Sequence, residues 1–285
     1  MKIAVLSGKG GTGKTLVSVN LAFVAGHSVY IDCDVEEPNG HLFFKPRDVK
    51  TDNVSVLIPS VDEKVCKGCR KCVDFCKFNA LAYIKNRLYV FDEICHSCGG
   101  CILLCPRNAL SETPRKIGAV KKGISDQVAV ITGVLNPGEA SGVPIIKSLL
   151  DSCDADAPYI FIDCPPGSAC IVMESIKDAD YCVLVAEPTI FGVHNLAMVH
   201  ELVRIFEKPH GVILNKCFDG FNPAEQFCLD NKIRILGKIP FNNELGSANS
   251  DAKIVSKEIN AYHELFSGLL TAIRQEAQHE AITNT

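Results

Sequence analysis

The chain has 285 residues, 47% of them apolar and 22% charged, with 29 Lys and Arg against 33 Asp and Glu for a net charge of −4. This length allows a full hydrophobic core, and the composition is too apolar for a disordered chain. The acidic balance argues against nucleic acid as the main partner, and no apolar run reaches the roughly 18 to 20 residues that span a bilayer.

Apolar runs of strand length alternate with helix-length stretches along most of the chain. The predicted strands are residues 2–6, 28–32, 128–135, 159–162, 181–186, 211–214 and 233–239. The predicted helices are residues 16–25, 145–150, 169–177, 195–206, 223–230 and 257–280. Most of the strands are apolar throughout, which is typical of strands buried on both faces of a sheet. The alternation predicts an α/β fold with a mostly parallel, doubly wound sheet.

A glycine-rich loop, SGKGGTGKT, follows the first predicted strand. Gly8, Gly13, Lys14 and Thr15 match the phosphate-loop pattern of two glycines, a lysine and a serine or threonine. The glycines let backbone N–H groups turn towards phosphate oxygens, Lys14 brings positive charge to the β- and γ-phosphates, and Thr15 offers a hydroxyl to Mg²⁺. The loop therefore predicts a nucleotide site.

The same loop also fits a second pattern. Gly8, Gly10 and Gly13 match the dinucleotide fingerprint, and Asp32 stands about 20 residues further on, where a ribose-binding carboxylate would lie. The lysine and threonine that close the loop favour the phosphate-loop interpretation.

With the additional Lys9, KGGTGKT resembles the deviant Walker A motif of the MinD, ParA, Mrp and nitrogenase iron-protein class of ATPases. In that class the first lysine reaches across a dimer to the partner's nucleotide, so Lys9 implies a homodimer closed around ATP. The resemblance implies that ATP and Mg²⁺ are held by the loop as a whole: Gly8, Lys9, Gly10, Gly11, Thr12, Gly13, Lys14 and Thr15.

Other strand ends resemble the same class. The resemblance implies that Asp34 orients the attacking water, that Asp163 holds Mg²⁺ through water, and that Gly167 senses the γ-phosphate. Carboxylates at the C-terminal ends of parallel strands converge on the crevice where such sheets bind ligands, which agrees with these roles. Capping of the next helix is the alternative for either Asp. Asn215 and Pro240 resemble the adenine contacts of the class.

Residues 61–113 interrupt the alternation with eight cysteines in two frames. CKGCRKCVDFCKFNAL begins at Cys66 and CHSCGGCILLCPRNAL begins at Cys95, and the two align without a gap. This duplication predicts an inserted, small α+β domain and a discontinuous ATPase domain over 1–60 and 114–285. Each frame has the C-x₂-C-x₂-C-x₃-C spacing of bacterial two-cluster ferredoxins.

The spacing predicts two [4Fe–4S] clusters with exchanged fourth ligands. The ligand sets are Cys66, Cys69, Cys72 and Cys105 for the first cluster, and Cys95, Cys98, Cys101 and Cys76 for the second. Lys77 follows Cys76 where proline is typical, which removes no ligand. Zinc is the alternative, because paired C-x₂-C units also bind zinc, but it does not account for two identical four-cysteine frames.

Seven further cysteines have no assigned chemistry, and most are expected to be small core residues. They are Cys33, Cys153, Cys164, Cys170, Cys182, Cys217 and Cys228. The first residues of the chain lack the pattern of a secretion signal, so we expect the cysteines in a reducing cytoplasm, that of an anaerobic or oxygen-poor prokaryote.

The leading hypothesis is a dimeric ATPase whose nucleotide cycle is coupled to electron transfer through two clusters. Lys9, Lys14, Asp34 and Asp163 would catalyse attack of water on the γ-phosphate, and a redox or iron–sulfur client protein would be the partner. The alternatives are an iron–sulfur assembly or carrier ATPase of the Mrp type and a positioning ATPase like MinD or ParA. The acidic charge and the lack of a basic amphipathic tail predict no nucleic-acid and no membrane partner.

Overall fold

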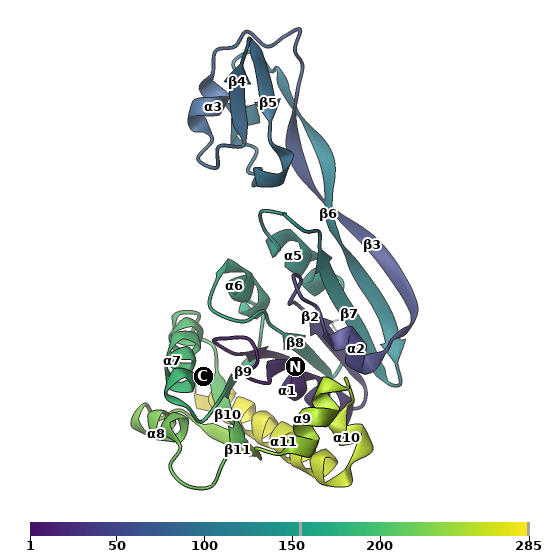
Figure 1. The fold of residues 1–285 in the computed structure, drawn as a ribbon, viewed down its shortest axis with the longest axis vertical. Coiled ribbons are helices and arrows are strands. Elements are labelled where there is room, and N and C mark those ends of the chain that lie inside the picture. Colours follow the sequence, from purple (N-terminus) through teal and green to yellow (C-terminus); the bar gives the residue numbers. More distant parts are fainter. Residues whose placement is uncertain (154–155, 284–285) are drawn as a thin grey trace.

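The computed structural model describes residues 1–153 and 156–283. A large α/β unit contains the first and the last elements of the chain, β1 (Lys2–Leu6) and α11 (Asn260–Thr283), and a small unit lies away from it at the end of a long two-stranded ribbon (Figure 1).

The large unit is built on a nine-stranded sheet in the order β11-β10-β9-β1-β8-β2-β7-β6-β3. Its strands are β1 (Lys2–Leu6), β2 (Ser28–Asp32), β3 (Arg47–Val61), β6 (Leu110–Ser125), β7 (Val128–Leu135), β8 (Tyr159–Asp163), β9 (Tyr181–Ala186), β10 (His210–Cys217) and β11 (Ile235–Pro240). Neighbouring strands from β11 to β7 pair in parallel. At one edge of the sheet, β6 pairs antiparallel with β7, and β3 pairs antiparallel with β6. The mostly parallel α/β sheet predicted from the sequence is confirmed.

Helices cover both faces of this sheet and enclose two hydrophobic cores. One face is covered by α5 (Val143–Asp151), α6 (Cys170–Ile176), α7 (Ile190–Ile205) and α8 (Pro223–Asp230). The other is covered by α1 (Lys14–Val24), α2 (Gly40–Phe44), α9 (Asn243–Ser250), α10 (Val255–Glu258) and α11 (Asn260–Thr283). In β1, Ile3 and Val5 enter one core while Ala4 and Leu6 enter the other. Burial on both faces explains why the central strands are mostly apolar, with aspartates only where β2 and β8 end.

The β3–β6 ribbon was not predicted from the sequence. The two strands pair from Arg47 opposite Ile124 to Val61 opposite Leu110. Only the part of β6 from Gly118 onwards also pairs with β7, so the remainder of the ribbon extends beyond the sheet. Most residues of β3 are exposed, and its sequence therefore lacks the apolar run that marks a buried strand.

The small unit contains both cysteine frames and has its own core. It comprises α3 (Lys71–Phe75), β4 (Leu81–Ile84), β5 (Arg87–Val90), the short 3₁₀ helix η1 (Asp92–Ile94) and α4 (Gly100–Leu103). The antiparallel pair β4–β5 packs with α3 and α4 around Cys72, Leu81, Leu88, Cys101 and Leu110. Among the described residues, we find no helix with the length and apolar character needed to cross a membrane.

Candidate functional site

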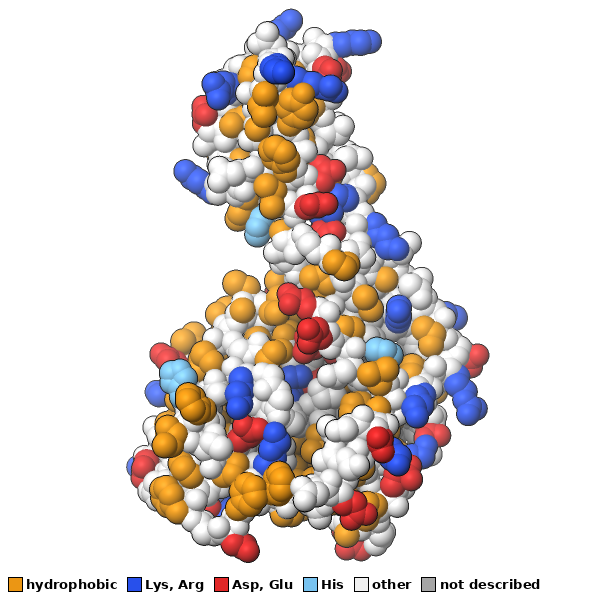
Figure 2. All heavy atoms as spheres, viewed as in Figure 1, with side chains coloured by type: hydrophobic (Ala, Val, Ile, Leu, Met, Phe, Trp, Pro, Cys, Tyr) orange, Lys and Arg blue, Asp and Glu red, His pale blue; other side chains and the backbone are white. Residues whose placement is uncertain are grey.

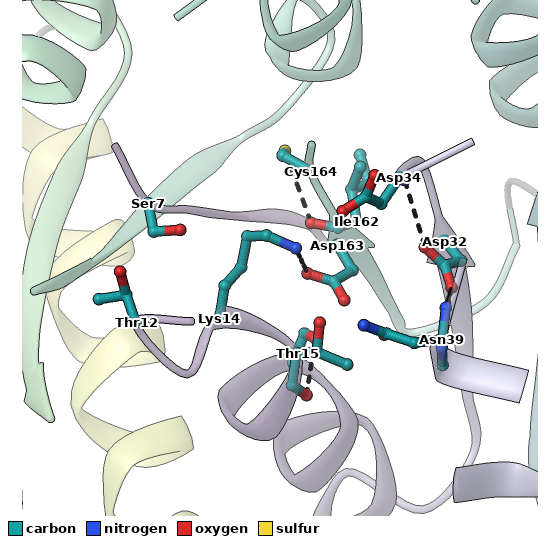
Figure 3. Close-up of polar contacts among 12 residues, drawn as sticks. Ser7, Thr12, Lys14, Thr15, Asp32, Asp34, Asn39, Ile162, Asp163 and Cys164 are labelled. Atoms are coloured by element: carbon teal, nitrogen blue, oxygen red, sulfur yellow. Dashed lines mark hydrogen bonds and ion pairs between the residues drawn. The ribbon is translucent and has the colours of Figure 1, made fainter. Parts of the chain in front are cut away.

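The phosphate loop joins β1 to α1 and presents Lys14 to a carboxylate from the neighbouring strand. Lys14 Nζ lies 2.5 Å from Asp163 Oδ1, and both side chains are buried (Figure 3). Gly13 has φ 97°, and a Cβ at this position would lie 2.1 Å from Asn215 Nδ2. Glycine is therefore required at position 13 both by the backbone conformation and by the space available.

Asp163 is fixed from both sides. Its second carboxylate oxygen, Oδ2, accepts a hydrogen bond of 2.8 Å from the Tyr30 hydroxyl. Tyr30 lies on β2, which pairs directly with β8. Tyr30 was not among the site residues predicted from the sequence. The feature that could have identified it is a tyrosine hydroxyl on a buried strand, two residues before an aspartate.

Asp32 organises the segment that leads into α2. It is fully buried and lies opposite Asp163 in the β2–β8 register. Its carboxylate accepts hydrogen bonds from the backbone N–H groups of Asp34, Asn39 and Gly40 at 2.9 to 3.2 Å. Because these bonds occupy a carboxylate with no exposure to solvent, Asp32 is not available to a ribose, and the dinucleotide interpretation loses its key residue.

Negative charge exceeds positive charge at this point of the site. Burial alone would lower the pKa of Lys14, but the carboxylates of Asp163, Asp32 and Asp34 together raise it. Burial, followed by the Asp163 charge, raises the pKa of Asp32 to about 7. Burial also raises the pKa of Asp34, against the attraction of Lys14. Three carboxylates thus share one lysine, an arrangement that a divalent cation would neutralise.

A cavity of about 420 Å³ opens beside these groups, within the range of ligand pockets. Ser7, Lys9, Lys14, Thr15 and Asp34 line it, and so do loop glycines 10, 11 and 13. Most of the predicted loop residues therefore meet Asp34 in one cavity, whereas Gly8, Thr12 and Asp163 are not among its lining residues. In Figure 3 the Lys14, Thr15, Asp34 and Asp163 side chains come together from three elements.

The remaining predicted nucleotide residues lie around this cavity. The Gly167 N–H donates to the Ser7 carbonyl at 2.9 Å, which brings the loop after β8 against the phosphate loop. Asn215 is buried, and its Nδ2 donates to the Thr12 carbonyl at 2.8 Å, so it supports the loop from beneath. Pro240 is exposed at the end of β11. Their adenine contacts stay predictions.

The Lys9 ammonium is engaged with an acidic residue of its own chain. Lys9 Nζ lies 2.9 Å from Glu187 Oε2, just beyond the end of β9. Glu187 was not among the predicted site residues, because a glutamate directly before a proline, here Pro188, is typical of an ordinary turn.

The cysteines of the first predicted cluster set line one small cavity, of about 20 Å³, in the small unit. Cys66, Cys69, Cys72 and Cys105 all line it, so the last cysteine of the second frame joins three cysteines of the first. Burial acts to raise the pKa of the Cys105 thiol, but nearby backbone N–H groups lower it overall. One of them, from Ala109, donates to Cys105 Sγ at 3.3 Å.

In the second cysteine frame, Cys95 and Cys98 lie near Cys101. Burial, together with the charges of Cys95 and Cys98, raises the pKa of Cys101 to about 11, which puts these three thiols within electrostatic range of one another. Across residues 1–153 and 156–283, no group of three or more His, Cys, Asp or Glu side chains is arranged to hold a metal ion.

Four of the seven unassigned cysteines are buried, in agreement with a packing role. They are Cys33, Cys164, Cys182 and Cys228. Cys170 is exposed, whereas Cys153 and Cys217 are half-buried.

The sequence of residues 3–255 matches the family described as the CobQ/CobB/MinD/ParA nucleotide binding domain. Two uncharacterized proteins of Methanocaldococcus jannaschii are similar to the chain. One is 32% identical over 278 residues, which cover 93% of this chain and 95% of the relative. The other is 28% identical over 225 residues, which cover 76% of this chain and 80% of the relative.

Solved structures share the fold. The cell division ATPase MinD of Pyrococcus furiosus has a TM-score of 0.61 at 18% identity, with 96% of this chain and 98% of that chain covered. The septum site-determining protein MinD of Pyrococcus horikoshii, complexed with Mg-ADP, has a TM-score of 0.57 at 19% identity, with 98% and 94% covered. An ATP complex of Cyanothece McdA has a TM-score of 0.56 at 16% identity, with 98% and 96% covered.

Proposed function

Because the chain belongs to the CobQ/CobB/MinD/ParA nucleotide-binding family, we propose that it is a MinD/ParA-type ATP switch that binds ATP with Mg²⁺ and hydrolyses it. The observation that carries this proposal is the pairing of Lys14 with Asp163, 2.5 Å apart, at the end of a cavity lined by the phosphate loop. The solved MinD and McdA complexes with Mg-ADP and ATP support the choice of nucleotide.

The residues present suit magnesium. Mg²⁺ prefers oxygen ligands and keeps several waters, so the Thr15 hydroxyl and the Asp163 carboxylate are suitable donors. The excess of carboxylates over lysine supports this assignment, since the charge of Asp163 adds to burial in raising the pKa of Asp32. Bound Mg²⁺ would neutralise charge on the β- and γ-phosphates.

The chain's own groups divide the remaining work of hydrolysis. Lys14, already desolvated, stabilises charge that develops on the γ-phosphate. Asp34 is half-buried on the rim of the cavity, where it can orient the attacking water. The Gly167 N–H donates to the Ser7 carbonyl, so the loop after β8 lies against the phosphate loop, where it can respond to the γ-phosphate.

Replacement of Asp34 tests the catalytic assignment. Asp34→Asn should keep ATP binding, because Lys14 and the loop remain, but lose most of the turnover, measured as phosphate release. Asp126→Asn is the matched control, since Asp126 is an exposed aspartate paired with Lys257 away from the cavity. Equal turnover in Asp34→Asn and the wild type would contradict the role of Asp34.

We further propose that ATP closes a homodimer through Lys9. The position of Lys9 on the rim of the cavity supports this, since its ammonium is partly exposed and lies at the surface of the loop. Sedimentation with and without a non-hydrolysable ATP analogue tests it, and an unchanged monomer at every concentration would count against it.

The family and fold comparisons favour a positioning role of the MinD or ParA type for this switch over the redox role expected from the cysteines. The similar solved structures include cell division ATPases and a Borrelia burgdorferi protein described as a putative plasmid partition protein. ATP-dependent co-sedimentation with anionic liposomes or with DNA would support positioning. If the protein binds neither liposomes nor DNA in the presence of ATP, the redox output is the better account.

A specific observation nevertheless supports an iron–sulfur output. The four cysteines assigned to the first cluster come from both frames and line one cavity. A single zinc ion would hold its four sulfurs only about 3.8 Å apart, given Zn–S bonds of about 2.3 Å. A four-iron cluster binds each sulfur to a different iron and therefore holds the four sulfurs further apart. The two identical cysteine frames favour the cluster over zinc.

We therefore propose that the small unit holds two [4Fe–4S] clusters, which would supply one-electron transfer. The second cluster would use Cys95, Cys98, Cys101 and Cys76. Anaerobic reconstitution followed by iron, sulfide and zinc analysis tests this: two clusters require equal iron and acid-labile sulfide. Zinc without sulfide would contradict it, and transfer of clusters to an apo-acceptor would favour the carrier function of the Mrp type.

The two units are connected near the nucleotide site, which supports coupling between them. The Leu135 N–H donates to the Val35 carbonyl at 2.8 Å, next to Asp34. In the loop that follows β7, Glu139 accepts two hydrogen bonds from Arg115 on the ribbon, at 2.8 and 2.6 Å. A change at Asp34 can therefore reach the base of the ribbon through hydrogen-bonded contacts.

A further inference from the structure

A single glutamate beside the phosphate loop holds two lysines at once. Glu187 Oε2 lies 2.9 Å from Lys9 Nζ, and Glu187 Oε1 lies 2.6 Å from Lys216 Nζ. Lys216 Nζ also donates to the Gly11 carbonyl at 2.8 Å. The three side chains therefore tie the ends of β9 and β10 to the phosphate loop.

The backbone at Glu187 is closely held, which fixes the direction of its side chain. The Thr189 N–H donates to the Glu187 carbonyl at 2.8 Å. A Cβ on Gly192 would lie only 2.1 Å from the same carbonyl oxygen, so the first turn of α7 packs directly against it. The Glu187 carboxylate is thus held between the end of β9 and the start of α7, and the ammonium groups of Lys9 and Lys216 contact it there.

The charges make this a strong contact for a partly exposed site. The Glu187 side chain is 11% exposed, against 42% for each lysine. Burial acts to raise the pKa of Glu187, but Lys216 and Lys9 lower it overall, so the carboxylate is ionised at neutral pH. Each of its oxygens faces one ammonium, and both lysines are occupied within their own chain.

We propose that Glu187 is a positioning residue that holds Lys9 on its own chain in the monomer and sets the threshold for ATP-dependent dimerisation. This inference rests on the proposed ATP-closed dimer. An ammonium that donates to Glu187 has to leave it before it can reach the phosphates of a second copy. Lys216 stays behind and continues to neutralise the carboxylate, which makes the release of Lys9 less costly than breaking an isolated pair.

Glu187→Gln removes the charge and keeps the shape. Partly exposed ion pairs contribute about 0.2 to 1 kcal/mol, which converts to about 1.4- to 5-fold for each site. Because a dimer releases two copies of Lys9, dimerisation of the variant with a non-hydrolysable ATP analogue should be about 2- to 30-fold tighter than that of the wild type. The readout is sedimentation of the full chain across a concentration series.

Three further variants separate positioning from simple structural support. Glu225→Gln is the matched control, because Glu225 pairs with Lys238 at 2.7 Å on the surface and should leave dimerisation unchanged. Lys216→Met leaves Glu187 with Lys9 alone, so the remaining pair should tighten and dimerisation should weaken. Because the dimer closes through Lys9, Lys9→Met should dimerise weakly, and adding Glu187→Gln to it should give no gain.

The outcomes distinguish this inference from the proposal on which it rests. If the wild type binds the analogue but stays monomeric, the dimer proposal fails and the inference fails with it. If the wild type dimerises and Glu187→Gln dimerises equally or less tightly, the dimer stands and the positioning role is overturned. A gain that persists in the Lys9→Met background would also overturn it.

Discussion

Replacing Asp32 by Asn is expected to remove a pH dependence from the stability of the fold. Burial, followed by the charge of Asp163, raises the pKa of Asp32 to about 7. An aspartate in the unfolded chain titrates at about pH 4. Between these values the folded chain holds a proton that the unfolded chain has lost, so the free energy of unfolding falls as the pH rises.

The size of the effect follows from the two pKa values. One pKa unit corresponds to about 1.4 kcal/mol, so the rise from 3.8 to about 7 lowers the free energy of unfolding by about 4 kcal/mol across the whole window. The part between pH 5 and pH 7 is about 2 kcal/mol, because Asp32 is half ionised at pH 7.

The assay is urea unfolding at pH 5, 6 and 7 for the wild type and Asp32→Asn. His200 contributes with the opposite sign, because burial lowers its pKa to about 4, but it does so in both proteins and cancels in the difference. Asp126→Asn is the control: its hydrogen bond to Lys257 lowers the Asp126 pKa, so it titrates below this window. Equal slopes for the wild type and Asp32→Asn would refute the reasoning.

Four other substitutions test separate contacts. Gly13→Ala should lower the free energy of unfolding by about 1 to 3 kcal/mol in urea, because φ is 97° and a Cβ meets Asn215. Tyr30→Phe should lower it by about 1 to 3 kcal/mol, because a buried oxygen of Asp163 loses its donor; no loss would contradict the 2.8 Å bond. Cys105→Ala should lose the first cluster and Cys76→Ala the second, each halving the bound iron; unchanged iron would contradict the ligand sets.

The sequence predicts the central sheet closely because its strands are buried on both faces. The ranges 2–6, 28–32, 128–135 and 181–186 coincide with β1, β2, β7 and β9. The β3–β6 ribbon could not be found in the same way, since it has solvent on much of both faces and its pairing joins residues far apart in the chain.

The same distinction applies to the site. The phosphate loop is local, so its glycines, Lys14 and Thr15 are found from spacing alone, and Asp163 is found as the end of an apolar strand. Tyr30 and Glu187 depend on contacts across the sheet, to Asp163 from β2 and to Lys9 from the end of β9. Such contacts follow from strand order and register, which the residues near each position do not specify.

Calorimetric titration of the folded chain with MgATP, in which the heat of binding is measured, tests the central claim most directly. The wild type should bind one nucleotide per chain. Lys14→Met should bind about 10- to 150-fold more weakly, the loss expected for hydrogen bonds to charged groups. Equal affinity in the two proteins, or no binding of MgATP to the wild type, would contradict the assignment of this cavity as an ATP site.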